Sequence, residues 1–369
     1  MKTLLYFLIV VGTVVLWWRL SRQYRVAKAF ADAQYPSFTP SQVFHHNHVM
    51  TLGRAVDPKV ALPSYLKYKE ALLVPVRTQG ECASCWAFVI ADMLADRISL
   101  HTRGRVRNHL SPQELLSCFM PWFFPCKQGG IPEMGLYYAI ARGLLSEKAY
   151  PYENESSTKI APCKLGKKRM GVWELWNLDA GRHEKKPERV FAKEGSIRSL
   201  CDEPSSQEVI DRNIENMKVE ILTNGPIIGT VMVYDDLYDY DGSSVYEVGP
   251  NAKLMGGHAV EIFGWSDAGA NTDEVGFQGA YWHVRNSWLM WPKNLPHKHT
   301  GWFYVKMGTN EAGIESRASC AAPLLTDAVK SMGKGSSWLS TAYTSYGAYV
   351  QDPERQNFFA HLAHRRKKG

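Results

Sequence analysis

The sequence predicts an α+β fold with helices in its front half and strands in its rear half. In residues 85–100, apolar side chains recur at helical spacing, and Asp92, Asp96 and Arg97 are available to the opposite face. This pattern predicts a central amphipathic helix whose first residue is Cys85. The rear half contains short β-branched and aromatic runs, which favour strands.

The strands of the rear half follow from three segments. Residues 219–222 end a predicted helix, 224–226 (Asn-Gly-Pro) form a turn, and 227–233 form a strand. Residues 260–265 and 280–285 are apolar and aromatic runs of strand length, so each predicts a further strand.

The composition is that of a globular protein whose two ends are basic. Of 369 residues, 45% are hydrophobic and 21% are charged, and the net charge is +7. Eight basic residues lie near the termini: Arg19, Arg22, Arg25, Lys28, Arg365, Arg366, Lys367 and Lys368. Without them the net charge is about −1, so we expect no nucleic acid partner.

The chain has seven cysteines, an odd number that fits three disulfides and one free, reactive thiol. The alternative is a set of reduced core cysteines in a cytosolic protein. The triplet Asn154-Glu155-Ser156 predicts N-glycosylation of Asn154 and agrees with a lumenal or secreted location.

The amino terminus contains an uncharged apolar run at residues 4–18 that ends at Arg19. Trp17 and Trp18 stand where a cleaved signal peptide has small residues, so we expect residues 1–19 to be an uncleaved single-pass transmembrane anchor. The alternative is signal cleavage, followed by secretion or delivery to a lysosome-like compartment.

The orientation of this anchor is predicted differently by charge and by cysteine usage. The basic residues that follow the run favour a cytoplasmic body, whereas disulfides favour the lumenal or extracellular side. We expect the lumenal or extracellular side because cysteine usage involves more of the chain.

The rest of the chain divides into three segments. Residues 20–61 are expected to be a stem or short propeptide, 62–323 the domain that carries the chemistry, and 324–369 a basic tail.

A cysteine at the start of a helix suits nucleophilic catalysis. The thiolate is the attacking form, and backbone N–H groups at a helix amino terminus stabilise it. A histidine must share its proton, a third group must hold the imidazole, and further donors must bind the developing oxyanion. Cys85 meets the requirement for a thiol at the start of a helix.

Three segments carry a specific resemblance to papain and the cathepsins. Residues 76–88, Val-Arg-Thr-Gln-Gly-Glu-Cys-Ala-Ser-Cys-Trp-Ala-Phe, closely resemble the nucleophile segment of that family. Residues 254–260 (Leu-Met-Gly-Gly-His-Ala-Val) resemble its histidine strand, and residues 285–288 (Arg-Asn-Ser-Trp) resemble its asparagine segment. The similarity covers about residues 62–323 and identifies a papain-like (C1 family) cysteine peptidase, nearest to the cathepsin B subfamily.

The resemblance implies the catalytic roles. Cys85 is the nucleophile, His258 its proton partner and Asn286 the residue that orients the histidine. The side-chain amide of Gln79 donates to the oxyanion, together with the backbone N–H of the nucleophile. Trp288 shields the histidine–asparagine bond from water.

The resemblance also implies substrate-binding residues. Gly129 and Gly130 match the glycine pair that lines the cleft in the family, although this chain has one residue more between Cys126 and the pair. Gly257, which precedes the histidine, is a further substrate-binding candidate. Trp288 belongs to the same set. Arg317 matches the acidic residue at the bottom of the second subsite of cathepsin B, so we expect basic side chains at P2 to be disfavoured and apolar or acidic ones accepted.

The fold implied by the resemblance has a helical domain and a β-barrel-like domain with the cleft between Cys85 and His258. It implies protein or peptide substrates, a monomer, and neither a metal nor an organic cofactor. Residues 164–205 are an insertion where cathepsin B carries its occluding loop, but His183 is the single histidine there. We therefore expect endopeptidase rather than carboxypeptidase activity.

By resemblance Cys82 pairs with Cys126 and Cys118 with Cys163, which leaves Cys201 and Cys320 to pair with each other. Two rival functions remain: a catalytically weak papain-like binding protein at a membrane, and a membrane-anchored thiol oxidoreductase that uses Cys82 and Cys85. Some large DNA viruses encode cathepsin-B-like enzymes with short leaders and anchors, so a viral source stays open.

Overall fold

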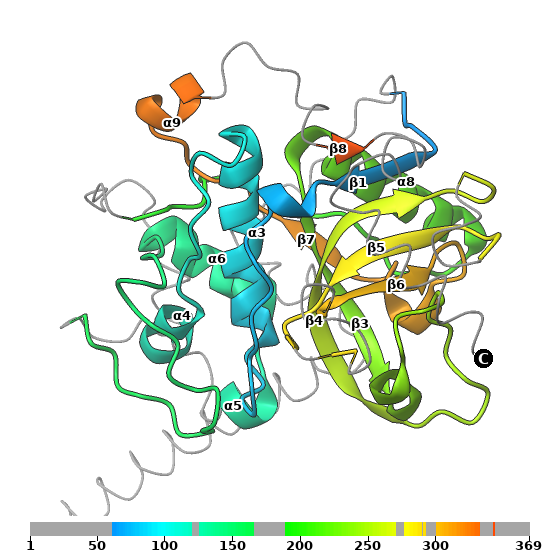
Figure 1. The fold of residues 1–369 in the computed structure, drawn as a ribbon, viewed down its shortest axis with the longest axis horizontal. Coiled ribbons are helices and arrows are strands. Elements are labelled where there is room, and N and C mark those ends of the chain that lie inside the picture. Colours follow the sequence, from blue (N-terminus) through cyan, green and yellow to red (C-terminus); the bar gives the residue numbers. More distant parts are fainter. Residues whose placement is uncertain are drawn as a thin grey trace, which may run out of the picture. The chain divides into compact units, whose positions relative to one another are not determined.

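The computed structural model describes residues 61–119, 125–165, 189–270, 277–289, 291–292, 300–332 and 342–343, and all of them belong to the unit Met50–Gly369. The predicted α+β class is confirmed. In Figure 1 the helices α3 to α6 lie together on one side, and the sheet lies on the other. The predicted anchor and nearly all of the predicted stem lie outside the described residues, among which no helix is long and apolar enough to cross a membrane.

Helix α3 (Cys85–His101) is the predicted central helix, and it begins at Cys85 as expected. The prediction that it is amphipathic is wrong, because Asp92, Asp96 and Arg97 are all buried. The helix lies between the other helices and the sheet and packs against both, so neither of its faces meets solvent. Its charged side chains are therefore buried and form ion pairs with residues far along the chain.

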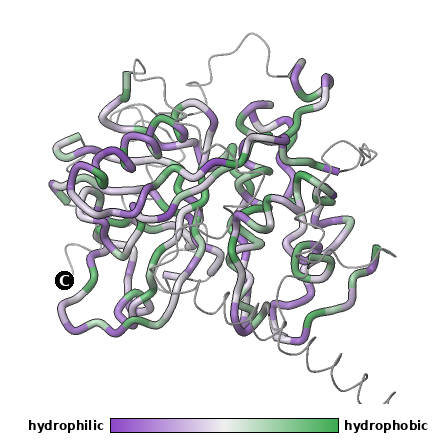
Figure 2. The backbone as a smooth tube through the Cα atoms, turned by 180° about the vertical axis from the view of Figure 1, so that it is seen from behind, coloured by the Kyte–Doolittle hydropathy of each residue, from purple (hydrophilic) through white to green (hydrophobic). Residues whose placement is uncertain are grey.

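Three shorter helices complete this side of the molecule, and α4 and α6 among them pack against α3. They are α4 (Pro112–Cys118), α5 (Pro125–Gln128) and α6 (Pro132–Ala141). The Ser111 hydroxyl caps α4 by accepting from the Glu114 N–H at 3.0 Å, which satisfies one of the open donors of the first turn. Apolar stretches occur in the helices and in the strands alike (Figure 2), so each side contributes to the interior.

Within the described part of the chain, eight strands form one antiparallel sheet in the order β2-β7-β3-β4-β1-β8, and β5 pairs with β4 and β6. The bounds are β1 Tyr65–Tyr68, β2 Arg198–Ser199, β3 Ile227–Tyr234, β4 Leu254–Ser266, β5 Tyr281–Arg285, β6 Trp302–Lys306, β7 Ala318–Cys320 and β8 Ala342–Tyr343. The strands predicted at 227–233, 260–265 and 280–285 are confirmed within β3, β4 and β5.

The other described elements are helices and short 3₁₀ helices. Helix α8 (Gln207–Asn224) ends at Gly225, whose φ of 98° suits glycine, and the chain then enters β3 as the Asn-Gly-Pro turn predicts. Short 3₁₀ helices are η1 (Glu70–Leu72), η2 (Asp235–Asp239) and η4 (Glu311–Gly313), and helix α9 (Asp327–Met332) lies near α3. Within the segment expected to be a basic tail, β8 joins the sheet by pairing with β1.

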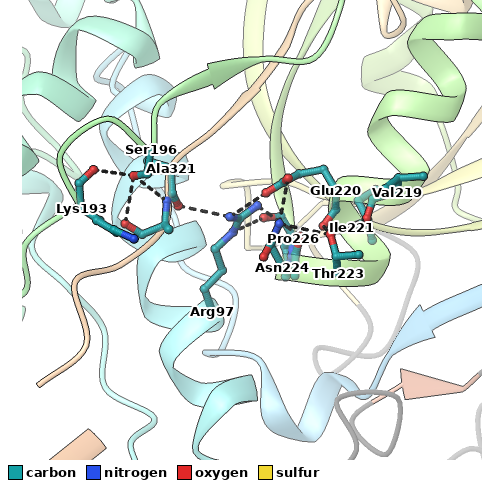
Figure 3. A network of polar contacts seen from close by, with 12 residues as sticks. Arg97, Lys193, Ser196, Val219, Glu220, Ile221, Thr223, Asn224, Pro226 and Ala321 are labelled. Atoms are coloured by element: carbon teal, nitrogen blue, oxygen red, sulfur yellow. Dashed lines mark hydrogen bonds and ion pairs between the residues drawn. The ribbon is translucent and has the colours of Figure 1, made fainter. Parts of the chain in front are cut away.

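Arg97 of α3 connects the helix to the rear half of the chain (Figure 3). Its guanidinium donates to the carbonyl oxygens of Pro226 at 2.9 Å and Ala321 at 3.3 Å, and it forms an ion pair with Glu220 of α8 at 3.0 Å. These contacts satisfy the buried charge and fix α3 against the turn that leads into β3.

The disulfides Cys82–Cys126 and Cys118–Cys163 form as the resemblance implies. The predicted bond between Cys201 and Cys320 is wrong, and both are free thiols. In the antiparallel register of β2 and β7, Arg198 lies opposite Cys320, so Cys201 is three positions further along. Three residues span about 10 Å of extended chain, which is too far for a disulfide.

The predicted glycosylation of Asn154 is also contradicted by the structure. The side chain is 1% exposed, and its amide nitrogen donates to the carbonyl oxygens of Ser157 at 2.7 Å and Lys159 at 3.0 Å. A glycan replaces one of the two hydrogens on this nitrogen, so one of these hydrogen bonds would be lost, and the buried side chain gives a glycan no direct access to solvent. The triplet instead stabilises a local turn.

His283 lies at the centre of the strand side and is fully buried, with no partner for either ring nitrogen among the described residues. Its ring contacts four aromatic rings at centroid distances of 5.3 to 5.8 Å: Tyr65, Phe263, Tyr281 and Tyr304. Burial, with the nearby charge of Lys67, lowers the pKa of His283 well below its usual value.

We predict that His283→Phe makes stability less sensitive to acid. An unfolded histidine takes up a proton near pH 6.5 while folded His283 stays neutral, so stability is lost as pH falls below that value, by about 1.4 kcal/mol per pH unit. Urea unfolding at pH 7.5 and 5.5 should show a decline smaller by about that amount in the variant. Tyr304→Phe, in the same cluster, should keep the wild-type decline; equal declines in all three proteins would contradict the prediction.

Candidate active site

Cys85 is placed at the first turn of α3, where it meets the strand that carries His258. Cys85 is partly exposed, and the backbone N–H of Ala259, the residue after His258, is close enough to its sulfur to favour a lower pKa. The backbone N–H groups of Trp86 and of Cys85 itself act on the pKa in the same direction. The nucleophile predicted from the sequence is thus next to the predicted histidine strand.

His258 of β4 is 5% exposed and bonds to Asn286, which directly follows β5. The distance from His258 Nε2 to Asn286 Oδ1 is 2.7 Å. An amide oxygen can only accept, so Nε2 carries the hydrogen and Nδ1 is left as the basic nitrogen. β5 pairs with β4, which explains how two residues far apart in sequence meet.

Trp288 covers the histidine–asparagine pair. Its ring stacks on that of His258 with a centroid distance of 4.5 Å and an interplanar angle of 25°. Tyr238, from η2, also stacks on Trp288, with a centroid distance of 5.8 Å, a contact that the sequence did not indicate. The aromatic cover keeps water from the 2.7 Å bond and so strengthens it.

Gln79 lies in the loop before α3 and is 7% exposed. Its Nε2 donates to the carbonyl oxygen of Cys82 at 2.9 Å, and its Oε1 accepts from the Ser287 hydroxyl at 2.7 Å. Its backbone N–H also donates to the Ser287 carbonyl at 2.8 Å. Ser287 follows Asn286, so the loop of Gln79 is fixed to the asparagine segment, and the second hydrogen of Nε2 remains available to a ligand.

Burial keeps Cys85 and His258 neutral when each is considered singly. It raises the pKa of Cys85, against the lowering effect of the three backbone N–H groups. It lowers the pKa of His258 to about 4, with the Asn286 bond acting in the opposite direction. Proton transfer from thiol to imidazole creates two opposite charges close together, whose attraction offsets the cost of burying them.

The predicted glycines flank the nucleophile. A Cβ on Gly129, whose φ is +73°, would lie 3.5 Å from the Ala83 carbonyl oxygen, and one on Gly130 would lie 2.6 Å from the Trp86 ring. Both neighbours are within two residues of Cys85. Gly257 is exposed, and a Cβ there would meet nothing within 4 Å, so the surface beside His258 is open.

Arg317 lies just before β7, one strand away from the histidine strand. Its carbonyl oxygen accepts from the Thr230 N–H of β3 at 3.0 Å, and Thr230 pairs with Ala259 of β4. Its Nε is buried and has no hydrogen-bond partner among the described residues.

The sequence model of the family described as "Papain family cysteine protease" matches residues 62–322.

The chain belongs to the papain family of cysteine proteases.

Two relatives from Caenorhabditis elegans are similar to this family member. It is 33% identical to cathepsin B-like cysteine proteinase 5 over 259 residues, which cover 67% of this chain and 69% of the relative. It is 30% identical to cathepsin B-like cysteine proteinase 4 over 281 residues, covering 74% and 76%. The solved structure of proCathepsin B S9 from Trypanosoma congolense matches with a TM-score of 0.54 and 21% identity, covering 78% and 82%, which supports the fold.

Behind these residues lies a buried ionic cluster centred on Arg285. Its guanidinium forms ion pairs with Asp96 at 2.6 Å and with Glu261, lies 4.0 Å from Asp92, and donates to the Val74 carbonyl at 2.8 Å. Asp92 and Asp96 come from α3 and Glu261 from β4. The cluster therefore joins the helix of Cys85, the strand of His258 and the strand that leads to Asn286.

The three carboxyl groups differ in protonation. Burial opposes ionisation of Asp92, but Arg77, His109 and Arg285 together hold its pKa well below the usual value. Burial raises the pKa of Asp96 to about 6 and that of Glu261 well above its usual value, in spite of Arg285. Asp96 and Glu261 approach the same guanidinium, and the charge of Asp96 raises the pKa of Glu261 further, so the two groups do not titrate independently.

The cluster was not predicted from the sequence, although the sequence contains one signal for it. Arg285 ends a strand of otherwise apolar and aromatic residues, and a buried charge in such a place requires a partner.

We predict that Arg285→Met lowers the free energy of unfolding by about 3–5 kcal/mol, because the variant leaves buried carboxylates without their cation. Arg212→Met is the matched control. Its ion pair with Asp202 is 35% and 70% exposed, so the loss there should stay below about 1 kcal/mol. Chemical unfolding at pH 7 measures both, and equal losses would show that the cluster has no special role.

Proposed function

We propose that this papain-family chain is a cysteine-type endopeptidase, a hydrolase that cleaves peptide bonds through a Cys85 thiolate and a His258 imidazolium. The observation that carries the proposal is the 2.7 Å bond from His258 to Asn286, beneath Trp288 and beside the sulfur of Cys85. This arrangement supplies a nucleophile, a base, and a group that orients the base.

In the proposed reaction, the Cys85 sulfur attacks the carbonyl carbon of the substrate and forms a tetrahedral intermediate. The backbone N–H of Cys85 and the free hydrogen of Gln79 Nε2 donate to its oxyanion. His258 then gives its proton to the leaving amine, and an acyl-enzyme remains. Water, deprotonated by His258, hydrolyses the thioester and restores the thiol.

The rival function as a thiol oxidoreductase is disfavoured by the pairing of the cysteines. Cys82 is fully buried and bonded to Cys126, so it is not available to form a disulfide with Cys85. The rival function as a catalytically weak binding protein is also disfavoured. It gives no reason for Cys85, His258, Asn286 and Gln79 to lie together in one site.

Endopeptidase specificity and the cellular setting complete the proposal. The insertion at 164–205 contains a single histidine, His183, which lies outside the described residues and lacks the neighbouring histidine that a carboxylate-binding pair needs.

We propose a membrane-anchored protein with its peptidase domain on the lumenal or extracellular side, acting as a monomer on protein or peptide substrates. A secreted or lysosome-like location is the alternative.

The test of the activity is labelling with an epoxide inhibitor of thiol proteases, followed by peptide mapping. We predict modification of Cys85 and a loss of hydrolysis of at least about 10³-fold in Cys85→Ser. Cys201→Ser is the control, because Cys201 is also a free thiol but contacts Met217 at 3.7 Å, away from the site. Labelling of Cys201 or Cys320 instead, or hydrolysis that survives in Cys85→Ser, would refute the assignment.

The preference at P2 tests the role of Arg317. We predict that substrates with an apolar or acidic P2 residue are cleaved well and Arg-Arg substrates poorly, because a half-buried guanidinium repels a second cation. Arg317→Glu should shift the ratio of kcat/KM between Arg and Glu at P2 by about tenfold or more towards Arg. Arg212→Glu should leave the ratio unchanged, and strong cleavage after Arg-Arg by the unmodified protein would contradict the prediction.

A further inference from the structure

The segment after Tyr150-Pro151 lies against the loop that precedes Cys85, and Tyr152 makes the central contact. Its hydroxyl donates to the backbone carbonyl of Gln79 at 2.7 Å and lies 2.8 Å from the Ser84 hydroxyl. A carbonyl can only accept, so the tyrosine hydrogen is committed to Gln79. Ser84 also lies 3.3 Å from the Cys82 carbonyl, but the Tyr152 oxygen is nearer at 2.8 Å, so we assign Ser84 as the donor to Tyr152.

The two partners of this hydroxyl lie at or next to the donors of the proposed oxyanion site. Gln79 supplies its side-chain Nε2, and Ser84 directly precedes Cys85, whose backbone N–H is the second donor. These two donors are six residues apart: Gln79 lies in an irregular loop and Cys85 begins α3, so no single helix or strand fixes their separation. The Tyr152 hydroxyl joins the two positions directly.

The rest of the segment holds Tyr152 in place. Its ring contacts Phe88 of α3 edge to face, with a centroid distance of 4.8 Å and an angle of 80°. The Glu155 carbonyl accepts from the Glu81 N–H at 3.0 Å. At Gly80, with a φ of +61°, a Cβ would lie 1.8 Å from that same carbonyl oxygen, so the two backbones are in close contact.

We propose that Tyr152 is a positioning residue that fixes the spacing between Gln79 Nε2 and the Cys85 N–H, and thereby the oxyanion site. The inference rests on the proposed function. Tyr152 touches neither the substrate nor the reacting atoms in this arrangement and acts through its two hydrogen bonds. A change in spacing affects the tetrahedral intermediate, whose oxygen needs both donors, far more than the bound substrate.

The test is Tyr152→Phe, which keeps the ring against Phe88 and removes the hydroxyl alone. We expect kcat to fall about tenfold while KM changes less than about twofold. Affinity for a peptide aldehyde should fall by a similar factor, because its adduct with the thiol places an oxygen in the oxyanion site. The rate of alkylation by iodoacetamide, which forms no such oxygen, should stay unchanged.

Tyr150→Phe is the matched control from the same segment. Its hydroxyl accepts from the Lys164 N–H at 3.0 Å and contacts the Cys118 sulfur at 3.8 Å, away from the proposed donors. This variant should keep kcat and aldehyde affinity within about twofold of the unmodified protein. Equal losses in the two variants would overturn the inference, as would a Tyr152→Phe loss that appears equally in alkylation.

Ser84→Ala provides a second and independent approach to the same bond. It should reproduce the selective loss of kcat and of aldehyde affinity, and in the double variant with Tyr152→Phe the two losses should not add. Full additivity would overturn the inference. An unmodified protein that hydrolyses no peptide refutes the proposed function, whereas an active protein that is indifferent to Tyr152→Phe refutes this inference alone.

Discussion

The structure depends on one guanidinium placed among three carboxyl groups in the interior. Arg285 binds Asp96 and Glu261 and lies near Asp92, so it fixes α3 against β4 and β5 at a single point. Charges without water are stable only in a well-defined geometry, and a small shift of either strand would leave one of them unpaired. Cys85 begins α3, His258 lies within β4 and Asn286 follows β5, so the cluster helps to fix the positions of these three residues.

A great deal of the fold and the site could be predicted because the relevant signals are local. The periodicity that predicts α3 lies within one stretch, and the Asn-Gly-Pro turn after α8 requires no distant partner. The burial of Asp92 and Asp96 could not be predicted in this way. A helical pattern shows which residues share a face of α3. It does not show that strands cover the polar face, because those strands come from a segment much later in the sequence.

The errors concerning Cys201 and Asn154 have a common physical cause. Counting cysteines assigns partners without distances, and the register of β2 against β7 keeps Cys201 from Cys320. The acceptor triplet likewise describes three residues, whereas burial of Asn154 is decided by Ser157, Lys159 and Gln113, which occupy its polar atoms. The distance between two cysteines and the burial of an asparagine both depend on tertiary structure. Neither a cysteine count nor a three-residue motif describes the path of the backbone in space.

The burial of the Cys82–Cys126 disulfide has a consequence for redox conditions. Cys82 and Cys126 are at most 4% exposed, whereas Cys85 is partly exposed, as is Cys163 of the second disulfide. Thiol–disulfide exchange requires a direct approach of one sulfur to another, so a small thiol in solution reaches Cys85 far sooner than the Cys82–Cys126 disulfide. The protein can therefore keep this disulfide oxidised and its proposed nucleophile reduced in the same surroundings, a separation maintained by access and kinetics.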